Sequence, residues 1–210
     1  MSEASRIQLI EYARKMNRSG INQGTSGNLS LRQDDGMLIT PSAVPYDDLE
    51  PGDIVQVNFD GSAVGPRKPS SEWRLHLDVY RDRPDARAIL HAHPVHCTAL
   101  ACLRRGIPAF HYMVAVAGGS DIRCSPYATF GTQELSAHAV AALEDRKACL
   151  MANHGLVCLA DILDAALALA IEIESLARSY LQCLSVGEPV ILDEDEMDRV
   201  LAKFESYKPG

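Results

Sequence analysis

Several patterns that define common protein classes are missing from this sequence of 210 residues. No apolar run approaches the roughly 20 residues that cross a bilayer, so we expect no contact with a membrane. The first residues carry neither a basic nor an apolar segment, and we therefore expect no secretory signal peptide. Gly-x-Gly-x-x-Gly and Gly-x-x-x-x-Gly-Lys-Ser/Thr motifs are also absent, which removes the usual sequence support for a bound nucleotide.

Basic residues are in the minority, with 20 Lys and Arg against 28 Asp and Glu and a formal net charge of -8. A nucleic-acid-binding protein shows the opposite balance, so we expect no nucleic-acid partner. An acidic protein can still hold a phosphorylated small molecule, because backbone N–H groups arranged in a nest bind anions.

Cysteine pairs of the Cys-x-x-Cys type are also missing, although the chain has six cysteines. This excludes a zinc ribbon and a thioredoxin-like motif. Most of the cysteines stand in apolar runs, where a free thiol behaves as a small hydrophobic group. Free thiols fit a reducing compartment, and we expect a cytoplasmic protein.

What is present is an ordinary globular composition, 47% hydrophobic and 23% charged, which predicts one domain over residues 1–210. Short apolar runs predict strands, and runs of helical periodicity predict helices. An extended segment is expected over 108–116. The strands are expected over 28–31, 37–40, 53–59, 86–92 and 148–152, and the helices over 5–20, 71–82, 94–105, 133–145, 163–184 and 193–207. This alternation indicates an α/β (α+β) domain of layered type.

The most informative stretch is Ile89-Leu90-His91-Ala92-His93-Pro94, at the end of a predicted strand. Because side chains of a strand alternate with a period of two, His91 and His93 point to the same side of the sheet. Two imidazoles side by side on a rigid element form half of a site for a divalent transition metal. An isolated His-x-His is also found without any metal, so a third ligand has to be identified.

His154 follows a second apolar run, 148–151, and offers that third imidazole. Three nitrogen ligands that leave one position open are typical of catalytic zinc sites. His96 is an alternative by proximity, but it comes after Pro94, where a helix is expected to turn it away from the pair. His76 and His138 fall in predicted helices and are expected to be surface or packing residues.

Glu72 stands at the predicted start of a helix, in Pro69-Ser70-Ser71-Glu72-Trp73. A carboxylate there stabilises the helix dipole, which alone would account for the residue. The functional alternative is a general acid/base beside the metal, because a carboxylate that leaves a cation for a dry pocket acquires a raised pKa. Both interpretations stay open at this point.

Three turns combine short polar side chains with exposed backbone N–H groups: Gly27-Asn28, Thr40-Pro41-Ser42 and Ser70-Ser71. If they converge, they form an anion site aided by a helix N-terminus. Each turn taken separately is ordinary turn or cap chemistry. The role of Tyr112 also has two interpretations, since a tyrosine can pack its ring or exchange a proton with a bound substrate.

Seven stretches resemble, in the same order and at compatible spacing, the class II, zinc-dependent aldolases of the L-fuculose-1-phosphate aldolase type, in the aldolase/epimerase superfamily. The stretches are 38–46, 69–74, 91–99, 108–113, 117–119, 126–132 and 153–156, and the likeness extends from the first helix to residues 203–207. The resemblance implies a central, mostly antiparallel sheet flanked by helices on both faces. It also implies a homotetramer with sites at the subunit interfaces.

The resemblance also implies roles for individual residues. One zinc ion per subunit would be bound by His91, His93 and His154. Glu72 would be the catalytic acid/base, and a further metal ligand in the empty enzyme, while Tyr112 would reach the aldehyde end from a neighbouring subunit. Phosphate would be held by Gly27, Asn28, Ser42, Ala43, Ser70 and Ser71, and the aldehyde end would be shaped by Phe130 and Tyr207.

The reaction implied is retro-aldol cleavage of a ketose 1-phosphate to dihydroxyacetone phosphate and a short aldehyde. L-Fuculose 1-phosphate, which gives L-lactaldehyde, is the first candidate substrate. The alternatives are the 1-phosphates of 5-deoxyribulose, methylthioribulose or rhamnulose, an epimerase, dehydratase or decarboxylase of the same superfamily, and a non-catalytic scaffold like the head domain of adducin. Another divalent metal is a further alternative, because affinities for such sites overlap along the divalent series.

One departure from the family pattern lies in the phosphate loop, where Ser42-Ala43 replaces the usual Thr-Gly. Serine keeps the hydroxyl, but alanine adopts a positive φ less readily than glycine. We therefore expect the position of the phosphate, and with it the preferred substrate, to shift.

Overall fold

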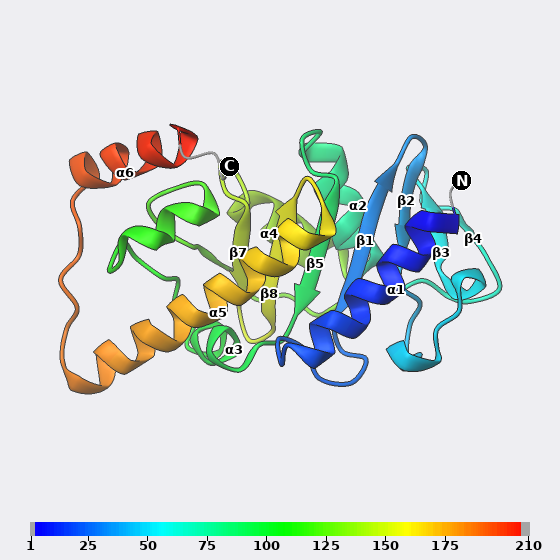
Figure 1. The fold of residues 1–210 in the computed structure, drawn as a ribbon, viewed down its shortest axis with the longest axis horizontal. Coiled ribbons are helices and arrows are strands. Elements are labelled where there is room, and N and C mark those ends of the chain that lie inside the picture. Colours follow the sequence, from blue (N-terminus) through cyan, green and yellow to red (C-terminus); the bar gives the residue numbers. More distant parts are fainter. Residues whose placement is uncertain (1–2, 207–210) are drawn as a thin grey trace.

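The computed structural model describes residues 3–206, which are built around an eight-stranded sheet of order β4-β3-β2-β1-β5-β8-β7-β6 (Figure 1). All neighbouring strands are antiparallel except β6 and β7, which are parallel. The expected mostly antiparallel sheet is therefore confirmed. The strands are β1 (Asn28–Gln33), β2 (Gly36–Ile39), β3 (Val55–Asn58), β4 (Ala63–Val64), β5 (Ala88–Ala92), β6 (Cys124–Ser125), β7 (Ala148–Met151) and β8 (Gly155–Ala160).

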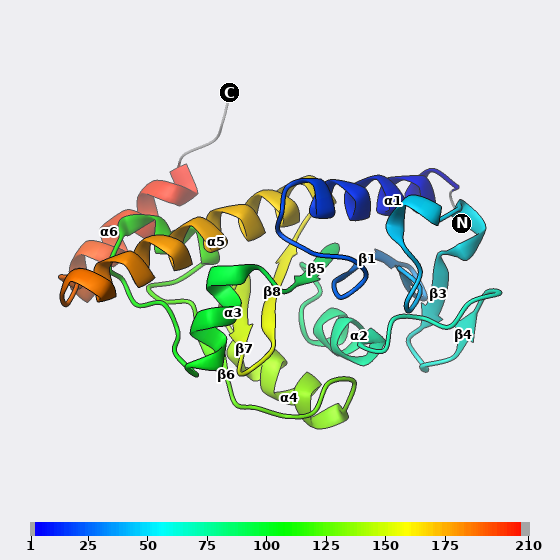
Figure 2. The ribbon, with the colours of Figure 1, turned by 90° about the horizontal axis from the view of Figure 1, so that it is seen from below.

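Helices cover both faces of this sheet, as expected (Figure 2). One face is covered by α1 (Glu3–Arg18), α3 (Val95–Cys102) and α5 (Leu163–Val186), and the other by α2 (Trp73–Asp82) and α4 (Gln133–Ala142). Strand residues alternate between the two cores: Leu90 and Ala92 of β5 pack on the α1–α5 side and Ile89 on the α2–α4 side. His91 shares the parity of Ile89, so its side chain lies on the side of α2.

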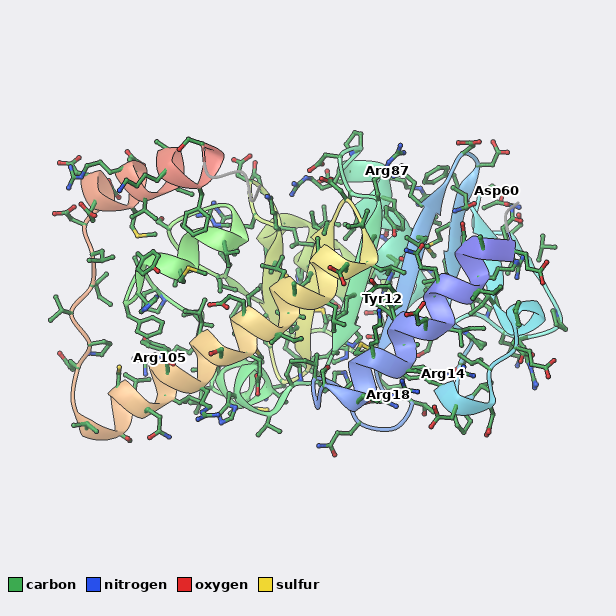
Figure 3. All side chains as sticks on the ribbon, viewed as in Figure 1. Tyr12, Arg14, Arg18, Asp60, Arg87 and Arg105 are labelled. Atoms are coloured by element: carbon green, nitrogen blue, oxygen red, sulfur yellow. The ribbon has the colours of Figure 1, made fainter. Side chains whose placement is uncertain are left out.

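Short 3-10 helices and loops complete the structure. The turn after β2 contains η1 (Tyr46–Asp48) and η2 (Pro51–Asp53), which α1 anchors from the side. Arg14 of α1, labelled in Figure 3, donates from Nε to the Tyr46 carbonyl at 3.0 Å. The Tyr46 hydroxyl in turn donates to the carbonyl of Gly27. This chain of contacts fixes the loop that leads into β1.

The structure adds one strand that was not expected and differs from one expectation. The segment 155–160 is the inner strand β8. It was not predicted because an apolar run without alternation does not distinguish a buried strand from a loop or a helix. The extended segment expected over 108–116 is wrong for η3 (Tyr112–Ala117), a 3-10 helix. Val114 and Ala117 stand three residues apart and are both buried in the core of α5, which favours the helical turn.

The last helix, α6 (Glu194–Ser206), packs on η3 through Met197 and Val200 (Figure 1). The helix expected over 193–207 is therefore confirmed as far as Ser206. Tyr207, expected to shape the aldehyde end, lies outside the described residues. Between residues 3 and 206, no helix combines the length and the apolar character that crossing a bilayer requires.

Candidate metal centre

His91 and His93 converge where β5 ends, as their spacing predicts. His91 is fully buried, and its Nδ1 lies 2.9 Å from the carbonyl oxygen of Leu156 in β8. A carbonyl only accepts, so Nδ1 carries a proton and Nε2 is the nitrogen that faces the cluster. That Nε2 lies 3.0 Å from Nε2 of His93. The backbone of β8 therefore sets the tautomer that a metal ligand needs.

His154 reaches the same point from the tight turn between β7 and β8. The turn depends on Asn153, which adopts φ 55°, a left-handed conformation that asparagine tolerates better than most residues. Gly155 then passes close to β5: a Cβ at this position would lie 2.7 Å from Cδ2 of His93 and 2.5 Å from the Ala92 carbonyl oxygen. A glycine is thus required where the second element meets the first.

The three imidazoles form one cluster. Their ligand nitrogens all lie within 4.8 Å of one another, and their ring centroids are 4.8 to 4.9 Å apart with edge-on orientations. Burial and the neighbouring imidazoles lower the pKa of His93 and of His154 to about 4. Both rings are therefore neutral at neutral pH and present lone pairs to a cation.

Glu72, the residue that precedes α2, completes the cluster. Its Oε2 lies 3.0 Å from Nε2 of His91 and its Oε1 lies 3.2 Å from Nε2 of His154. Burial opposes ionisation of this carboxyl, but His91, His154 and the Asn28 amide outweigh burial and hold its pKa below the ordinary range. The Glu72 carboxylate likewise outweighs the effect of burial on His91 and raises the pKa of that ring.

The donor set fits a divalent metal ion. Oε1 of Glu72 is buried without a hydrogen-bond partner among the described residues, an arrangement that a bound cation would relieve. Three imidazoles and a carboxylate are ligands that zinc and its neighbours in the first transition row prefer. The His91–His93–His154 triad is thus a metal-binding arrangement.

A cavity of about 390 Å³ opens onto this cluster. Its wall contains predicted metal, acid/base, phosphate and aldehyde-end residues, together with residues for which the sequence predicted no role. The predicted residues in the wall are Ser42, Ala43, Ser71, Glu72, His93, Phe130 and His154, and the additional ones are Thr25, Ser26, Tyr127, Ala128 and Asn153. Two of the three polar turns therefore line one cavity, and Thr25 and Ser26, just before the third turn, line it too, which is the arrangement that an anion site needs.

The remaining predicted phosphate residues lie directly behind this wall. A Cβ on Gly27 would lie 2.6 Å from the His91 carbonyl oxygen, so this glycine allows β1 to approach β5. Ser70 is buried, and its Oγ accepts from the backbone N–H of Glu72 at 3.3 Å. Asn28 lies opposite His91 in the β1–β5 pairing and donates from Nδ2 to Oε2 of Glu72 at 3.1 Å. Contact of these three residues with phosphate stays a prediction.

Ala43 carries the departure from the family pattern noted in the sequence. It adopts φ 58°, the left-handed conformation that costs a residue with a Cβ about 1–2 kcal/mol. The loop therefore keeps the backbone shape that glycine would favour. Any shift of the bound phosphate has to come from the added methyl group.

Tyr112 and His96 lie apart from the cavity of their own chain. Tyr112, in η3, is 51% exposed and does not belong to the cavity wall. Nδ1 of His96 lies 2.7 Å from Oε1 of Glu174, so the expectation that His96 leaves the metal site is confirmed. His76, expected to be a surface or packing residue, is fully buried, which confirms the packing alternative, and its ring is also hydrogen-bonded to Asn28, next to Glu72. Its i,i+4 spacing from Glu72 was a signal that sequence analysis missed.

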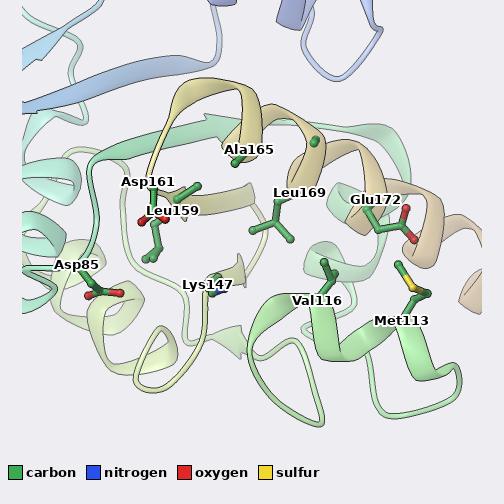
Figure 4. Close-up of a pocket in the computed structure, with 11 residues that line it drawn as sticks. Asp85, Met113, Val116, Lys147, Leu159, Asp161, Ala165, Leu169 and Glu172 are labelled. Carbon is green, nitrogen blue, oxygen red and sulfur yellow. The ribbon is translucent and has the colours of Figure 1, made fainter. Parts of the chain in front are cut away.

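A second cavity, of about 430 Å³, lies between η3, α5 and the end of β8 (Figure 4). Its wall is largely apolar, with Met113, Val116 and Leu169, and its charged residues include Lys147 and Glu172. None of the predicted site residues belongs to it. The chemistry of this chain is therefore centred on the triad.

Comparison with known families gives a match over most of the chain. The model described as "Class II Aldolase and Adducin N-terminal domain" matches residues 7–181. All three histidines of the triad and Glu72 fall inside this range.

Named relatives match nearly the whole length. The chain is 56% identical over 204 residues to a 5-methylthioribulose-1-phosphate/5-deoxyribulose-1-phosphate aldolase of Rhodospirillum rubrum, with 97% of this chain and 92% of the relative covered. It is 50% identical over 201 residues to an L-fuculose phosphate aldolase of Escherichia coli, with 95% and 94% covered. Among solved structures, an L-fuculose 1-phosphate aldolase superimposes with a TM-score of 0.94 at 42% identity, with 98% of both chains covered.

Proposed function

Since this chain belongs to the family of class II aldolases and adducin N-terminal domains, we propose a substrate and a division of roles for the reaction that it catalyses. The chain is an aldolase, a lyase that cleaves a ketose 1-phosphate. The proposed substrate is 5-deoxyribulose 1-phosphate or its 5-methylthio analogue, with L-fuculose 1-phosphate as the second candidate. The observation that carries this proposal is one cavity whose wall brings together His93 and His154 of the triad, Glu72 and residues of two polar turns.

One observation supports this order of substrates, and a second supports all three candidates alike. The motif resemblance favours L-fuculose 1-phosphate, whereas the 56% identity to the methylthioribulose/deoxyribulose enzyme exceeds the 50% identity to the fuculose enzyme. In addition, Tyr127 and Phe130 are 50% and 64% exposed in the cavity wall. Apolar side chains at the aldehyde end suit a methyl or methylthio terminus, which all three candidates share.

The proposed roles follow from the positions of the side chains. His91, His93 and His154 hold a divalent metal, with zinc as the proposed ion. When bound, such an ion acts as a Lewis acid that polarises the ketone oxygen of the substrate and stabilises the charge that develops there. The hydroxyls and backbone N–H groups of Ser42, Ala43 and Ser71, in the cavity wall, bind the 1-phosphate.

Glu72 moves the proton at carbon. When the carbon–carbon bond breaks, the electron pair stays on the dihydroxyacetone phosphate fragment and Glu72 delivers a proton to that carbon. In the direction of synthesis Glu72 removes the same proton. Its Oε1 has no hydrogen-bond partner among the described residues, so this oxygen would exchange the proton once the carboxylate leaves the cation and its pKa rises.

In synthesis the Tyr112 hydroxyl donates its proton to the aldehyde oxygen, which becomes a hydroxyl of the ketose, and in cleavage that proton returns to Tyr112. Because it is half exposed and does not line the cavity of its own chain, we assign it to the cavity of a neighbouring copy. The proposed assembly is a homotetramer with the sites at its interfaces. This arrangement would cover both the exposed tyrosine and the open side of the cavity.

The first test is the release of dihydroxyacetone phosphate from the candidate 1-phosphates, with rhamnulose 1-phosphate as a stereochemical control. We expect release with all three main candidates, the highest kcat/KM with the 5-deoxy or 5-methylthio sugar, and loss of release after metal chelation. Equal or greater kcat/KM with L-fuculose 1-phosphate would overturn the order of substrates. No release from any of these sugars by zinc-loaded protein would favour the epimerase, dehydratase or decarboxylase alternatives.

The Glu72→Gln variant tests the division of roles. The amide keeps the size of the side chain but cannot act as an acid or base near neutral pH, so we expect bound zinc within about twofold of wild type and kcat lower by about a thousandfold or more. Metal content by mass spectrometry and kcat by the same assay check both parts. Wild-type turnover in this variant would exclude Glu72 as the acid/base, and absence of metal from the wild type would favour the scaffold alternative.

A further inference from the structure

Behind Glu72, a chain of buried polar side chains leads away from the cavity. Nδ2 of Asn28 donates to Oε2 of Glu72 at 3.1 Å, and Oδ1 of Asn28 lies 2.5 Å from Nε2 of His76. Nδ1 of His76 lies 2.6 Å from Oγ of Ser30, which lies 2.9 Å from the hydroxyl of Tyr80. All five side chains are buried, and only Glu72 belongs to the cavity wall.

The chemistry of these groups fixes the direction of every hydrogen bond. The Glu72 carboxylate only accepts, so Asn28 presents its NH₂ group there and its carbonyl oxygen to His76. His76 must then carry its proton on Nε2 and accept on Nδ1. The Ser30 hydroxyl donates to that nitrogen and accepts from Tyr80. Burial lowers the pKa of His76 to about 3, so the ring is neutral and holds a single N–H.

Two sequence spacings assemble this chain. Glu72 directly precedes α2, and His76 and Tyr80 follow at intervals of four residues, so the three side chains lie on one face of the helix. Asn28 and Ser30 stand two residues apart on the same side of β1, which pairs with β5. The packing of α2 against β1 therefore joins the two series behind the carboxylate.

We propose that His76 is a positioning residue that, through Asn28, fixes the rotation of the Glu72 carboxylate and leaves Oε1 free toward the reacting carbon. The proposal rests on the proposed function, because it concerns the carboxylate assigned there as acid/base. Held at Oε2 from behind, the carboxylate keeps Oε1 on the side of the triad, 3.2 Å from Nε2 of His154 and without a hydrogen-bond partner among the described residues. Donors aligned head to tail also stabilise the negative charge of Glu72.

A matched pair of substitutions separates positioning from mere packing. The side-chain nitrogen of glutamine coincides with Nε2 of histidine, whereas that of asparagine coincides with Nδ1. We therefore expect His76→Gln to keep kcat within about threefold of wild type, and His76→Asn to lower kcat by about 10- to 100-fold with KM unchanged. Equal losses in both variants, in proportion to lost stability, would overturn the proposal.

A second measurement needs no turnover. In zinc-free protein labelled with ¹⁵N-histidine, the ring shifts of His76 should report a neutral Nε2–H tautomer whose proton exchanges slowly. The side-chain NH₂ protons of Asn28 should be protected in wild type and in His76→Gln, and unprotected in His76→Asn. An Nδ1–H tautomer, or unprotected Asn28 protons in wild type, would overturn the proposal even if the aldolase assignment holds.

Ser30→Ala supplies a third variant should both His76 variants fail to fold. It removes the donor to Nδ1 of His76, and we expect a mixture of His76 tautomers with kcat lower by about 10-fold. Tyr12→Phe is the control, since it removes an exposed hydroxyl hydrogen bond, to Asp164 at 3.0 Å, on the side of the sheet that α1 covers, opposite His76 (Figure 3). If the sugar panel gives no turnover while the NMR results are as expected, the proposed function fails and the hydrogen-bond chain stands.

Discussion

At the level of single residues, the triad depends on how closely the backbone approaches around its ligands. Gly27 and Gly155 lie where β1 and the turn after β7 meet β5, and neither position has space for a Cβ. Asn153 supplies the left-handed conformation that turns His154 toward the other two histidines. None of these residues is one of the three histidine ligands, yet they determine where those ligands lie.

Gly155→Ala is expected to weaken metal binding. The added Cβ would lie 2.7 Å from the His93 ring and 2.5 Å from the Ala92 carbonyl oxygen, so either the ring or the strand must move. We expect a loss of about 1–3 kcal/mol in the free energy of unfolding and at least a tenfold loss in zinc affinity, measured by competition with a chelator. Gly52→Ala is the control, because no atom lies within 4 Å of its Cβ position. Unchanged zinc affinity in Gly155→Ala would show that the close approach is unimportant.

At the level of elements, the site is assembled where strands end and helices begin. β5 ends after Ala92, α2 begins after Glu72, and α3 begins after Pro94. The start of α3 is held by Glu174 of α5, whose carboxylate accepts from the backbone N–H groups of His96 and Cys97, both at 2.9 Å. One helix on the far face of the sheet thus fixes the segment that carries His93.

Glu174→Ala is expected to loosen that segment. It removes three hydrogen bonds that involve the start of α3, including the one from Nδ1 of His96, and leaves the helix N-terminus uncapped. We expect the free energy of unfolding, measured by urea denaturation, to fall by about 2 kcal/mol. Glu172→Ala on the same helix is the control, since no hydrogen bond of its side chain is found between residues 3 and 206. Equal losses in the two variants would contradict a capping role for Glu174.

For the whole molecule, the open question is how copies associate. Tyr112, Tyr127 and Phe130 expose half or more of their surface. If each cavity takes Tyr112 from a neighbour, two variants with different defects should complement each other. We expect a mixture of Glu72→Gln and Tyr112→Phe, refolded together, to recover about a quarter of the wild-type kcat, because a random ring pairs the two intact residues at that frequency.

Sedimentation provides the companion measurement, with an expected mass of four times the 22.9 kDa of one chain. Each variant refolded alone is the control for recovery. A mixture no more active than the sum of its components would place Tyr112 and Glu72 in sites that are not shared between subunits. A monomeric mass with full activity would exclude the tetramer.

The sequence was sufficient for the parts of the site that follow from local geometry. A strand period of two predicts that His91 and His93 lie side by side, and a helix start predicts a fixed Glu72; both are confirmed. The order of motifs was sufficient for the family, which the match over residues 7–181 confirms.

The rest was decided by packing between distant segments. His154 reaches the triad because β8 inserts between β5 and β7, and a continuous apolar run does not reveal that it will become an inner strand. His76 lies behind Glu72 because α2 packs on β1, and burial depends on this partner rather than on the residue type. Local periodicity thus fixes which side chains share a face, while the strand order fixes which faces meet.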